Sequence, residues 1–184
     1  MNLFVLDKDP VKAAQLQCDK HVVKMVVESA QMLSTAHRML DGAVELRPSK
    51  SGKTNVKYWV HPDSNQEQVL YRVAHQAHPC TIWTMQSNNN YNWHYIHFAA
   101  LCDEYKYRYG KEHMSDTKLR DILKTPPRNI PVGYLTPQPL AMKSNPECMF
   151  EDTVKSYRAY YQTKQARFKM VWTKREIPEW FQVA

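Results

Sequence analysis

One long, apolar helix with a narrow polar stripe restricts the fold of this chain more than any other feature of its sequence. Asp9 and Pro10 are typical of a helix start, because Asp accepts hydrogen bonds from free amide groups and Pro suits the first helical position. The helix is expected to continue to about Leu40 and to end at Asp41-Gly42. Apolar side chains surround most of its circumference, so we expect it to lie at the centre of the protein.

Glycine is scarce, and this scarcity argues against several fold classes. The chain of 184 residues holds only four glycines, whereas hairpin turns, Rossmann folds and P-loops depend on glycine at defined positions. The stretch 51–54 resembles the end of a P-loop but lacks the upstream glycine. We therefore predict a mainly α-helical fold, a single domain over residues 1–184, with about five helices, a long Pro-rich loop and little or no sheet.

Local signals set the expected element boundaries. Ser64-x-x-Glu67 forms a capping box, the Asn run that follows Ser87 is a point where a helix can break, and Gly110 suits a helix C-cap. The expected helices cover about 9–40, 64 to the bend at 79, 81–109, 116–124 and 149–170, with loops at 43–60 and 125–146.

Two further segments carry structural expectations. The predicted loop 43–60 holds Lys50, Lys53 and Lys57, so it is either a mobile flap that contacts phosphate or a simply solvated loop. The tail from 172 to 181 carries two Trp residues and is expected to pack onto the body of the protein.

Charge and aromatic content favour an anionic partner. The net charge is +7, and the chain has 11 Tyr and five Trp. We predict binding of nucleic acid, with DNA favoured, or of a nucleotide, because cations neutralise phosphates and aromatic rings stack on bases. The alternative is that the rings only pack the core. The last predicted helix mixes both residue types, namely Lys155, Arg158, Lys164, Arg167 and Lys169 with Tyr157, Tyr160 and Tyr161.

The cysteines and the hydropathy pattern bear on location. Four widely spaced cysteines, a short N-terminal apolar run without a basic region, and the lack of an 18-residue apolar stretch predict a cytoplasmic protein with free thiols and no membrane span. The sequence does not indicate an oligomeric state.

The polar stripe of the first helix is the strongest candidate site. It consists of Gln17, Lys20, His21, Lys24, Glu28, Gln31, Thr35 and Arg38, which share about a third of the helical circumference. Glu28 is predicted to act as a base or nucleophile and His21 as an acid or base. Lys20 and Lys24 would anchor phosphate, and Gln31 would contact substrate. The alternative is a solvent-exposed face with surface ion pairs.

A second group lies at residues 75–80. His75 and His78 are three residues apart before Pro79, and either site residues or helix-end residues fit this spacing. We predict His78 as a third catalytic residue and His75 as a substrate contact. A zinc ion held by Cys18, His21, His78 and Cys80 is an alternative, because the ligand types suit zinc although the spacing matches no strong zinc signature.

A third group could hold a base, and a fourth could hold phosphate. Spacings of three to four residues place Trp83, Ser87, Asn90 or Tyr91, and His94 on one helical face, where aromatic rings lie beside amide and hydroxyl groups. The alternative is ordinary helix packing. Near the Pro-rich loop, Lys124 and Arg128 could contact phosphate. Glu104 and Arg108, four residues apart, predict a structural salt bridge.

Five short strings of the sequence are distinctive, namely Asp7-x-Asp9-Pro10, the run from Cys18 to Met25, His78-Pro79-Cys80-x-x-Trp83, the run from Tyr107 to Lys111, and the run from Pro178 to Phe181. Together they resemble a family of small tailed-phage proteins with no established reaction. The resemblance covers nearly the whole chain and implies a setting in phage nucleic-acid metabolism or interference with host defence, in the host cytoplasm. The H-x-E and P-C-x-x-C signature of zinc deaminases is missing.

The leading hypothesis from the sequence is an enzyme that acts on nucleic acid or nucleotides at the base or the N-glycosidic bond, as a glycosylase does. Glu28, His21 and His78 would be catalytic, by analogy with the carboxylates of glycoside hydrolysis. No cofactor is required by this hypothesis. The alternatives are a non-catalytic binder of nucleic acid or of a nucleotide signal, and a zinc-dependent protein.

Overall fold

The computed structural model describes residues 1–183, and the fold over these residues is mainly α-helical, as predicted. Seven α-helices and one two-stranded antiparallel sheet make up the regular structure, with two short 3₁₀ turns. The elements are α1 (Pro10–Gln15), α2 (Asp19–Asp41), β1 (Ala43–Pro48), β2 (Asn55–Val60), α3 (Ser64–Val69), α4 (Pro79–Gln86), α5 (Asn88–Tyr109), α6 (Met114–Leu123), η1 (Pro146–Cys148), α7 (Thr153–Gln162) and η2 (Thr163–Ala166).

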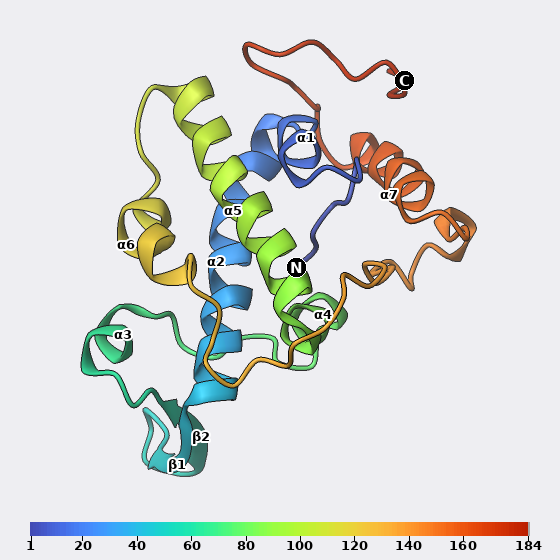
Figure 1. Cartoon of the computed structure of the whole chain (residues 1–184). Helices are drawn as coiled ribbons and strands as arrows, with labels where there is room; N and C mark the ends of the chain where they lie inside the picture. Colours follow the sequence, from blue (N-terminus) through green and yellow to red (C-terminus); the bar gives the residue numbers. More distant parts are fainter. Residues whose placement is uncertain (184) are drawn as a thin grey trace.

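Two long helices form the centre of the molecule. Helix α5 packs across α2, and α1, α4 and α6 surround this pair (Figure 1). The N-terminal arm before α1 runs into the interior, where Leu3, Val5 and Leu6 are fully buried. The first long helix is therefore central, as its apolar circumference predicts, and part of its polar stripe is covered by this arm.

The first predicted helix is in fact two helices, and this corrects the range 9–40. Helix α1 ends at Gln15 and α2 begins at Asp19, with Cys18 as its N-cap. Hydrogen bonds from distant parts of the chain stabilise the interruption between α1 and α2. The Cys18 amide donates to the Tyr161 hydroxyl at 2.8 Å, and the Trp172 indole donates to the Leu16 carbonyl at 2.9 Å.

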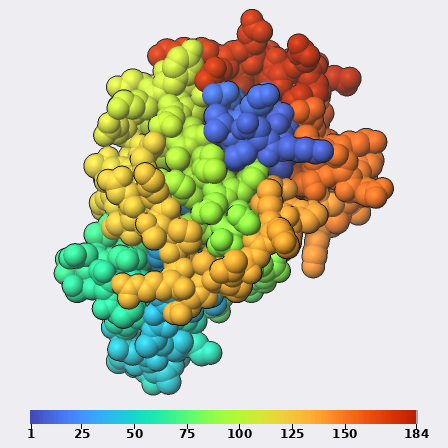
Figure 2. Space-filling view, viewed as in Figure 1, coloured from blue at the N-terminus to red at the C-terminus, as the bar shows by residue number. Residues whose placement is uncertain are grey.

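The segment 43–60 is a β-hairpin, which corrects the predicted loop. Strands β1 and β2 pair from Ala43 opposite Val60 to Pro48 opposite Asn55. Gly52 has φ +71°, a conformation that favours glycine, within the connecting turn. The hairpin projects from one end of the molecule (Figures 1 and 2), and every residue of β1 is exposed. Its strands therefore lack the buried, alternating pattern that would have revealed them.

Two helix boundaries elsewhere follow the local signals, and three do not. Ser87 divides α4 from α5 and accepts from the Asn90 amide, and Gly110 caps α5 with φ +68°. The N-cap of α3 is Asp63 rather than Ser64, and α3 ends at Val69, well before Pro79. The last predicted helix, 149–170, is shorter and consists of α7 and η2.

Arg38, near the end of α2, ties the hairpin and α3 to the central helix. Its side chain is 2% exposed, and all five guanidinium N–H groups have acceptors. These are the carboxylate of Glu67 and the carbonyls of Trp59, Glu67, Leu70 and Tyr71. Arg38 was predicted as part of a polar stripe, and in the structure it is a buried structural cation.

The predicted salt bridge between Glu104 and Arg108 is present and forms part of a larger network. The Arg108 Nε lies 2.7 Å from Glu104, and its Nη1 lies 2.8 Å from Asp19 at the start of α2. Arg175, on the C-terminal tail, also contacts Glu104 at 2.8 Å. The tail packs on the body as predicted, because Trp172 is buried.

Residues 124–145 contain no helix or strand and lie across the molecule (Figure 2). We call this segment the strap. It is held to the start of α5, where the Gly133 amide donates to Asn88 and the Thr136 amide donates to Asn90. At its beginning, the amides of Arg128 and Asn129 donate to the carboxylate of Asp41.

Candidate functional site

Glu28 lies where the N-terminal arm crosses the stripe of α2. Its Oε1 is 3.2 Å from the Lys24 ammonium, and its Oε2 is 3.5 Å from the amino group of Met1. The side chain is only 13% exposed, and Oε2 is sealed from solvent without a hydrogen-bond partner among the described residues. A carboxylate oxygen in this state is costly to bury unless nearby cations compensate, so the two amines stabilise its charge.

His78 belongs to the same neighbourhood. It caps α4 by accepting from the Cys80 amide with Nδ1 at 3.2 Å, so the neutral ring carries its proton on Nε2. Burial lowers the pKa of His78, and the positive charge of the Met1 amino group acts in the same direction, whereas the charge of Glu28 opposes it. Met1, Lys24, Glu28 and His78 thus form one electrostatically coupled group, which we call the Glu28 cluster.

His21 lies on the same helix but in a different environment from the one predicted for an acid or base. The ring is 7% exposed and stacks on Phe4 at 4.5 Å between centroids. Its Nδ1 lies 2.7 Å from the Tyr161 hydroxyl, which accepts from the Cys18 amide and therefore donates to His21. Burial, aided by the charges of Lys164 and Lys24, lowers the pKa of His21 to about 4. His21 therefore packs α2 against α7 as a neutral ring.

The residues predicted to hold a base lie in the interior. Asn90 donates to the Trp83 carbonyl at 2.9 Å and to the Thr136 hydroxyl at 2.9 Å, and the Trp83 indole donates to the Thr136 carbonyl. Ser87 donates to the Tyr134 carbonyl, so these side chains hold the strap. The Tyr91 hydroxyl donates to the Leu123 carbonyl, and His94 is fully buried. Their internal hydrogen bonds give them a structural role in place of the predicted one.

The remaining predicted contacts are spread over the surface. Lys20 is exposed above the ring of Phe168, and His75 is exposed with φ +50°. Gln31 is half-buried on α2. Lys124 and Arg128 are exposed on the strap. Of the predicted residues, only Lys24, Glu28 and His78 fall in the Glu28 cluster.

The four residues of the predicted zinc set are not brought together. Within residues 1–183, Cys18, His21, His78 and Cys80 do not form a group with ligand atoms at metal-binding distances. Burial raises the pKa of Cys18 and raises that of Cys80 to about 12, which disfavours the thiolate form that binds zinc. Cys18, the N-cap of α2, is fully buried in the core.

A different group meets the geometry of a metal site. His37 and Asp41 on α2 and His61 just after β2 offer ligand atoms that all lie within 4.8 Å of one another. Both imidazoles are buried. One feature of the sequence could have indicated this site. His37 and Asp41 are four residues apart on a helix, and residues with this spacing share a face. The third ligand comes from beyond the unpredicted hairpin.

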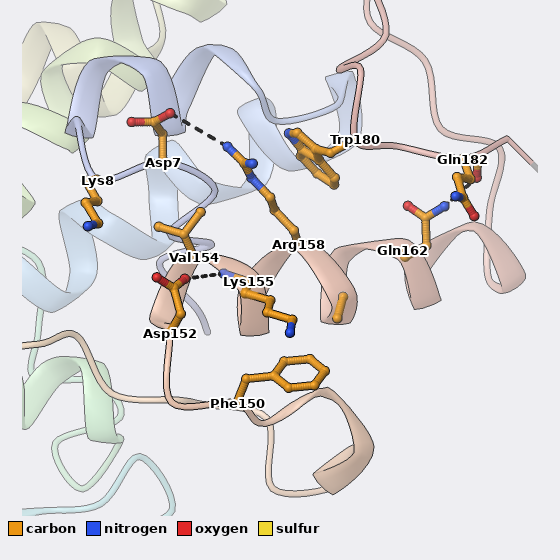
Figure 3. A pocket seen from close by; sticks show the side chains of 11 residues that line it. Asp7, Lys8, Phe150, Asp152, Val154, Lys155, Arg158, Gln162, Trp180 and Gln182 are labelled. Atoms are coloured by element: carbon orange, nitrogen blue, oxygen red, sulfur yellow. Dashed lines mark hydrogen bonds and ion pairs between the residues drawn. The ribbon is translucent and has the colours of Figure 1, made fainter.

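A cavity lies between the N-terminal arm, α7 and the C-terminal tail. It has a volume of about 700 Å³. Figure 3 shows Arg158 extending from α7 between Asp7 and Trp180. Its guanidinium lies 5.3 Å from the indole centroid and 3.8 Å from the Asp7 carboxylate. The cavity is lined by Asp7, Lys8, Phe150, Asp152, Val154, Lys155, Arg158, Ala159, Gln162, Trp180 and Gln182.

A second cavity of about 430 Å³ shares three of these residues, Asp7, Arg158 and Trp180. Together the two cavities form a groove, the Arg158 groove, on both sides of that side chain. The Trp180 indole nitrogen is buried without a hydrogen-bond partner among the described residues. The basic and aromatic mixture predicted for the last helix therefore contributes Lys155 and Arg158 to this groove, and the tail contributes the main aromatic ring.

Neither long helix, nor any other among residues 1–183, combines the length and the apolar character that a membrane span requires. No protein-family model matches this chain, and neither does any curated protein or solved structure with which it was compared.

Proposed function

We propose that the protein is an enzyme that acts on nucleic acid or nucleotides at the N-glycosidic bond, with Glu28 as the catalytic carboxylate. One observation carries this proposal: Glu28 Oε2 is buried and free of hydrogen bonds, beside two amines and a half-buried imidazole. A buried polar atom without a hydrogen bond is uncommon in a folded protein, and a catalytic role is one reason for it.

The chemistry follows from the groups of the Glu28 cluster. A water oxygen bonds to the sugar C1′ while the C1′–N bond breaks, and the electron pair of that bond leaves with the base. Glu28 accepts the proton of the water and stabilises the oxocarbenium-like sugar. The imidazolium form of His78 gives a proton to the departing base. The lowered pKa of His78 makes this form a stronger acid.

The Arg158 groove supplies the contacts to a larger substrate. Asp7 and Lys8 line the groove, and Met1, at the other end of the same arm, lies beside Glu28. Six residues of extended chain span at most about 20 Å, so a strand of a few nucleotides could reach from the groove to the Glu28 cluster. The net charge of +7 favours such a partner.

The test is release of free base by the purified protein from oligonucleotides, modified oligonucleotides and nucleosides, measured by mass spectrometry. Glu28→Gln keeps the shape of the side chain and removes its charge. We expect a loss of about 100-fold or more in rate with an unchanged fold, whereas exposed Glu112→Gln keeps the rate. The rate should also rise as the pH falls toward the lowered pKa of His78. Full activity of Glu28→Gln would contradict the proposal.

A second candidate function, binding without chemistry, is favoured by the Arg158 groove itself. Trp180 and Phe150 offer faces for bases, and Lys155 and Arg158 offer cations for phosphate. Binding of a labelled oligonucleotide that is recovered unaltered would support it. Arg158→Gln should then weaken binding, while Lys118→Gln, an exposed control on α6, should not. Equal binding by both variants would exclude the groove as the binding surface.

A further inference from the structure

The group formed by His37, Asp41 and His61 is separate from both the Glu28 cluster and the Arg158 groove. We infer that it binds one divalent transition-metal ion of the zinc class through these three side chains. The inference does not depend on the proposed function. It rests on the ligand atoms lying within 4.8 Å of one another and on two buried imidazole nitrogens that have no hydrogen-bond partner in residues 1–183, His37 Nδ1 and His61 Nε2.

The orientation of His37 is fixed in the form that a metal requires. Its Nε2 lies 2.8 Å from the Tyr91 hydroxyl, and that hydroxyl donates to the Leu123 carbonyl at 2.8 Å. The phenolic oxygen must therefore accept, so His37 carries its proton on Nε2 and a lone pair on Nδ1. Histidine ligands of metals characteristically donate their second N–H to such an outer partner.

Asp41 is held equally firmly and retains capacity for a metal. Its two oxygens accept from the amides of Arg128 and Asn129 at 2.8 and 2.9 Å. Each carboxylate oxygen has two lone pairs, so one on each remains available. The strap thus orients the Asp41 carboxylate toward the two histidines and leaves one lone pair on each oxygen available.

His61 is the ligand that must change on binding. Its Nε2 lies 3.9 Å from Asp41 Oδ2, and its Nδ1 accepts from the Asp63 amide at 3.2 Å. This arrangement places the ring proton on Nε2. A metal at Nε2 displaces that proton, the ring takes the tautomer protonated on Nδ1, and the Asp63 contact opens.

An adjacent pocket supplies the remaining coordination position. It has a volume of about 290 Å³ and is lined by His37, Asp41, Gln66, Asp121, Ile122, Thr125, Pro126 and Arg128. The side-chain oxygen Oε1 of Gln66 is buried without a hydrogen-bond partner among the described residues. Two histidines and one carboxylate beside an open pocket match sites that keep one position for water or substrate. Asp121 and Arg128 would face whatever binds there.

The experiment uses the full chain after treatment with a chelator, titrated with Zn²⁺ in a calorimeter. We expect one ion per chain, and at least a 100-fold weaker Kd for His61→Ala and for Asp41→Asn. The exposed His75→Ala is the matched control and should bind as the wild type does. No stoichiometric binding, or equal binding by the His61 and Asp41 variants, would overturn the inference.

A second measurement covers the case in which those variants do not fold. X-ray absorption at the zinc edge of the wild-type complex should show a first shell of nitrogen and oxygen that includes two imidazoles. A sulfur ligand would instead place the ion at a cysteine and overturn the inference. Loss of binding in the His75 variant would do the same, because His75 is not one of the three ligands.

Discussion

Two charged side chains of α2, Glu28 and Arg38, are ten residues apart and differ in how far their hydrogen-bonding groups are satisfied. Arg38 has an acceptor for every N–H group, four of them backbone or side-chain oxygens from α3 and the chain after it, and one from the end of β2. Glu28 has two cations nearby but leaves Oε2 without a hydrogen bond. Both side chains come from the same predicted polar stripe.

This difference in hydrogen bonding distinguishes a structural charge from a candidate catalytic charge. A buried charge with every hydrogen-bonding group satisfied fixes the position of its partners, and its removal leaves them unpaired. A buried charge with an open lone pair can accept a proton or stabilise a developing cation. The comparison therefore supports a structural role for Arg38 and agrees with the catalytic role that we propose for Glu28, and both roles can be tested by measurement.

The largest expected effect is on stability at Arg38. Arg38→Met should lower the free energy of unfolding by about 3–5 kcal/mol, because it removes the cation that pairs with the Glu67 carboxylate and the donor of four backbone carbonyls. Urea denaturation measures this loss. Arg47→Met, on the exposed hairpin, is the matched control and should cost less than about 1 kcal/mol. Similar losses in the two variants would contradict the structural role of Arg38.

The next effect concerns His21, the stripe residue that the structure buries as a neutral ring. Its folded pKa of about 4 lies below the unfolded value, so the unfolded chain binds the extra proton between about pH 6.5 and pH 4. Its contribution is complete above that window and is lost as the pH falls. The free energy of unfolding should be measured at about pH 6.5 and at about pH 4 for both proteins. On this acidification, His21→Gln should lose about 3 kcal/mol less than the wild type.

Exposed His75→Gln is the control for this pH dependence and should follow the wild-type curve. If His21→Gln follows that curve as well, the His21 ring is not held neutral in the fold.

A smaller effect on stability is expected at Glu28. Glu28→Gln should change the free energy of unfolding by less than about 1 kcal/mol, because neither of its two ion pairs is both close and buried: Lys24 is 64% exposed, and the Met1 amino group lies 3.5 Å from Oε2, a long separation for an ion pair. Denaturation in parallel with Arg38→Met would show the contrast directly. A loss as large as that of Arg38→Met would mean that Glu28 is chiefly structural.

The smallest effect is expected at Lys24. Its pair with Glu28 has the spacing i, i+4 and one exposed partner, so Lys24→Ala should cost about 0.3–0.5 kcal/mol. Lys106→Ala removes another exposed pair, that with Glu112, and serves as the control for the loss of a solvated ion pair. A much larger loss at Lys24 than at Lys106 would show that its ammonium is needed to compensate the buried carboxylate.

Part of the fold and the site could be predicted from local patterns. The central helix, the division at Ser87 and the cap at Gly110 depend on residues close in sequence, and all three are present. The hairpin at 43–60 could not be recognised, because its strands are exposed and carry no buried alternating pattern. The break at Cys18 depends on Tyr161, which lies far along the chain.

The sequence by itself determined a mainly helical protein with a basic surface and a polar stripe on its first long helix. Helical periodicity depends on residues that are close together in the sequence, and net charge depends on residue type alone. Only the tertiary structure decided what each stripe residue does. The N-terminal arm covers His21 and reaches Glu28, α3 saturates Arg38, and the end of the hairpin brings His61 to His37 and Asp41. Polar residues of the same stripe became fully hydrogen-bonded, as Arg38 is, or kept an oxygen without a hydrogen bond, as Glu28 does, according to the partners that distant segments supplied.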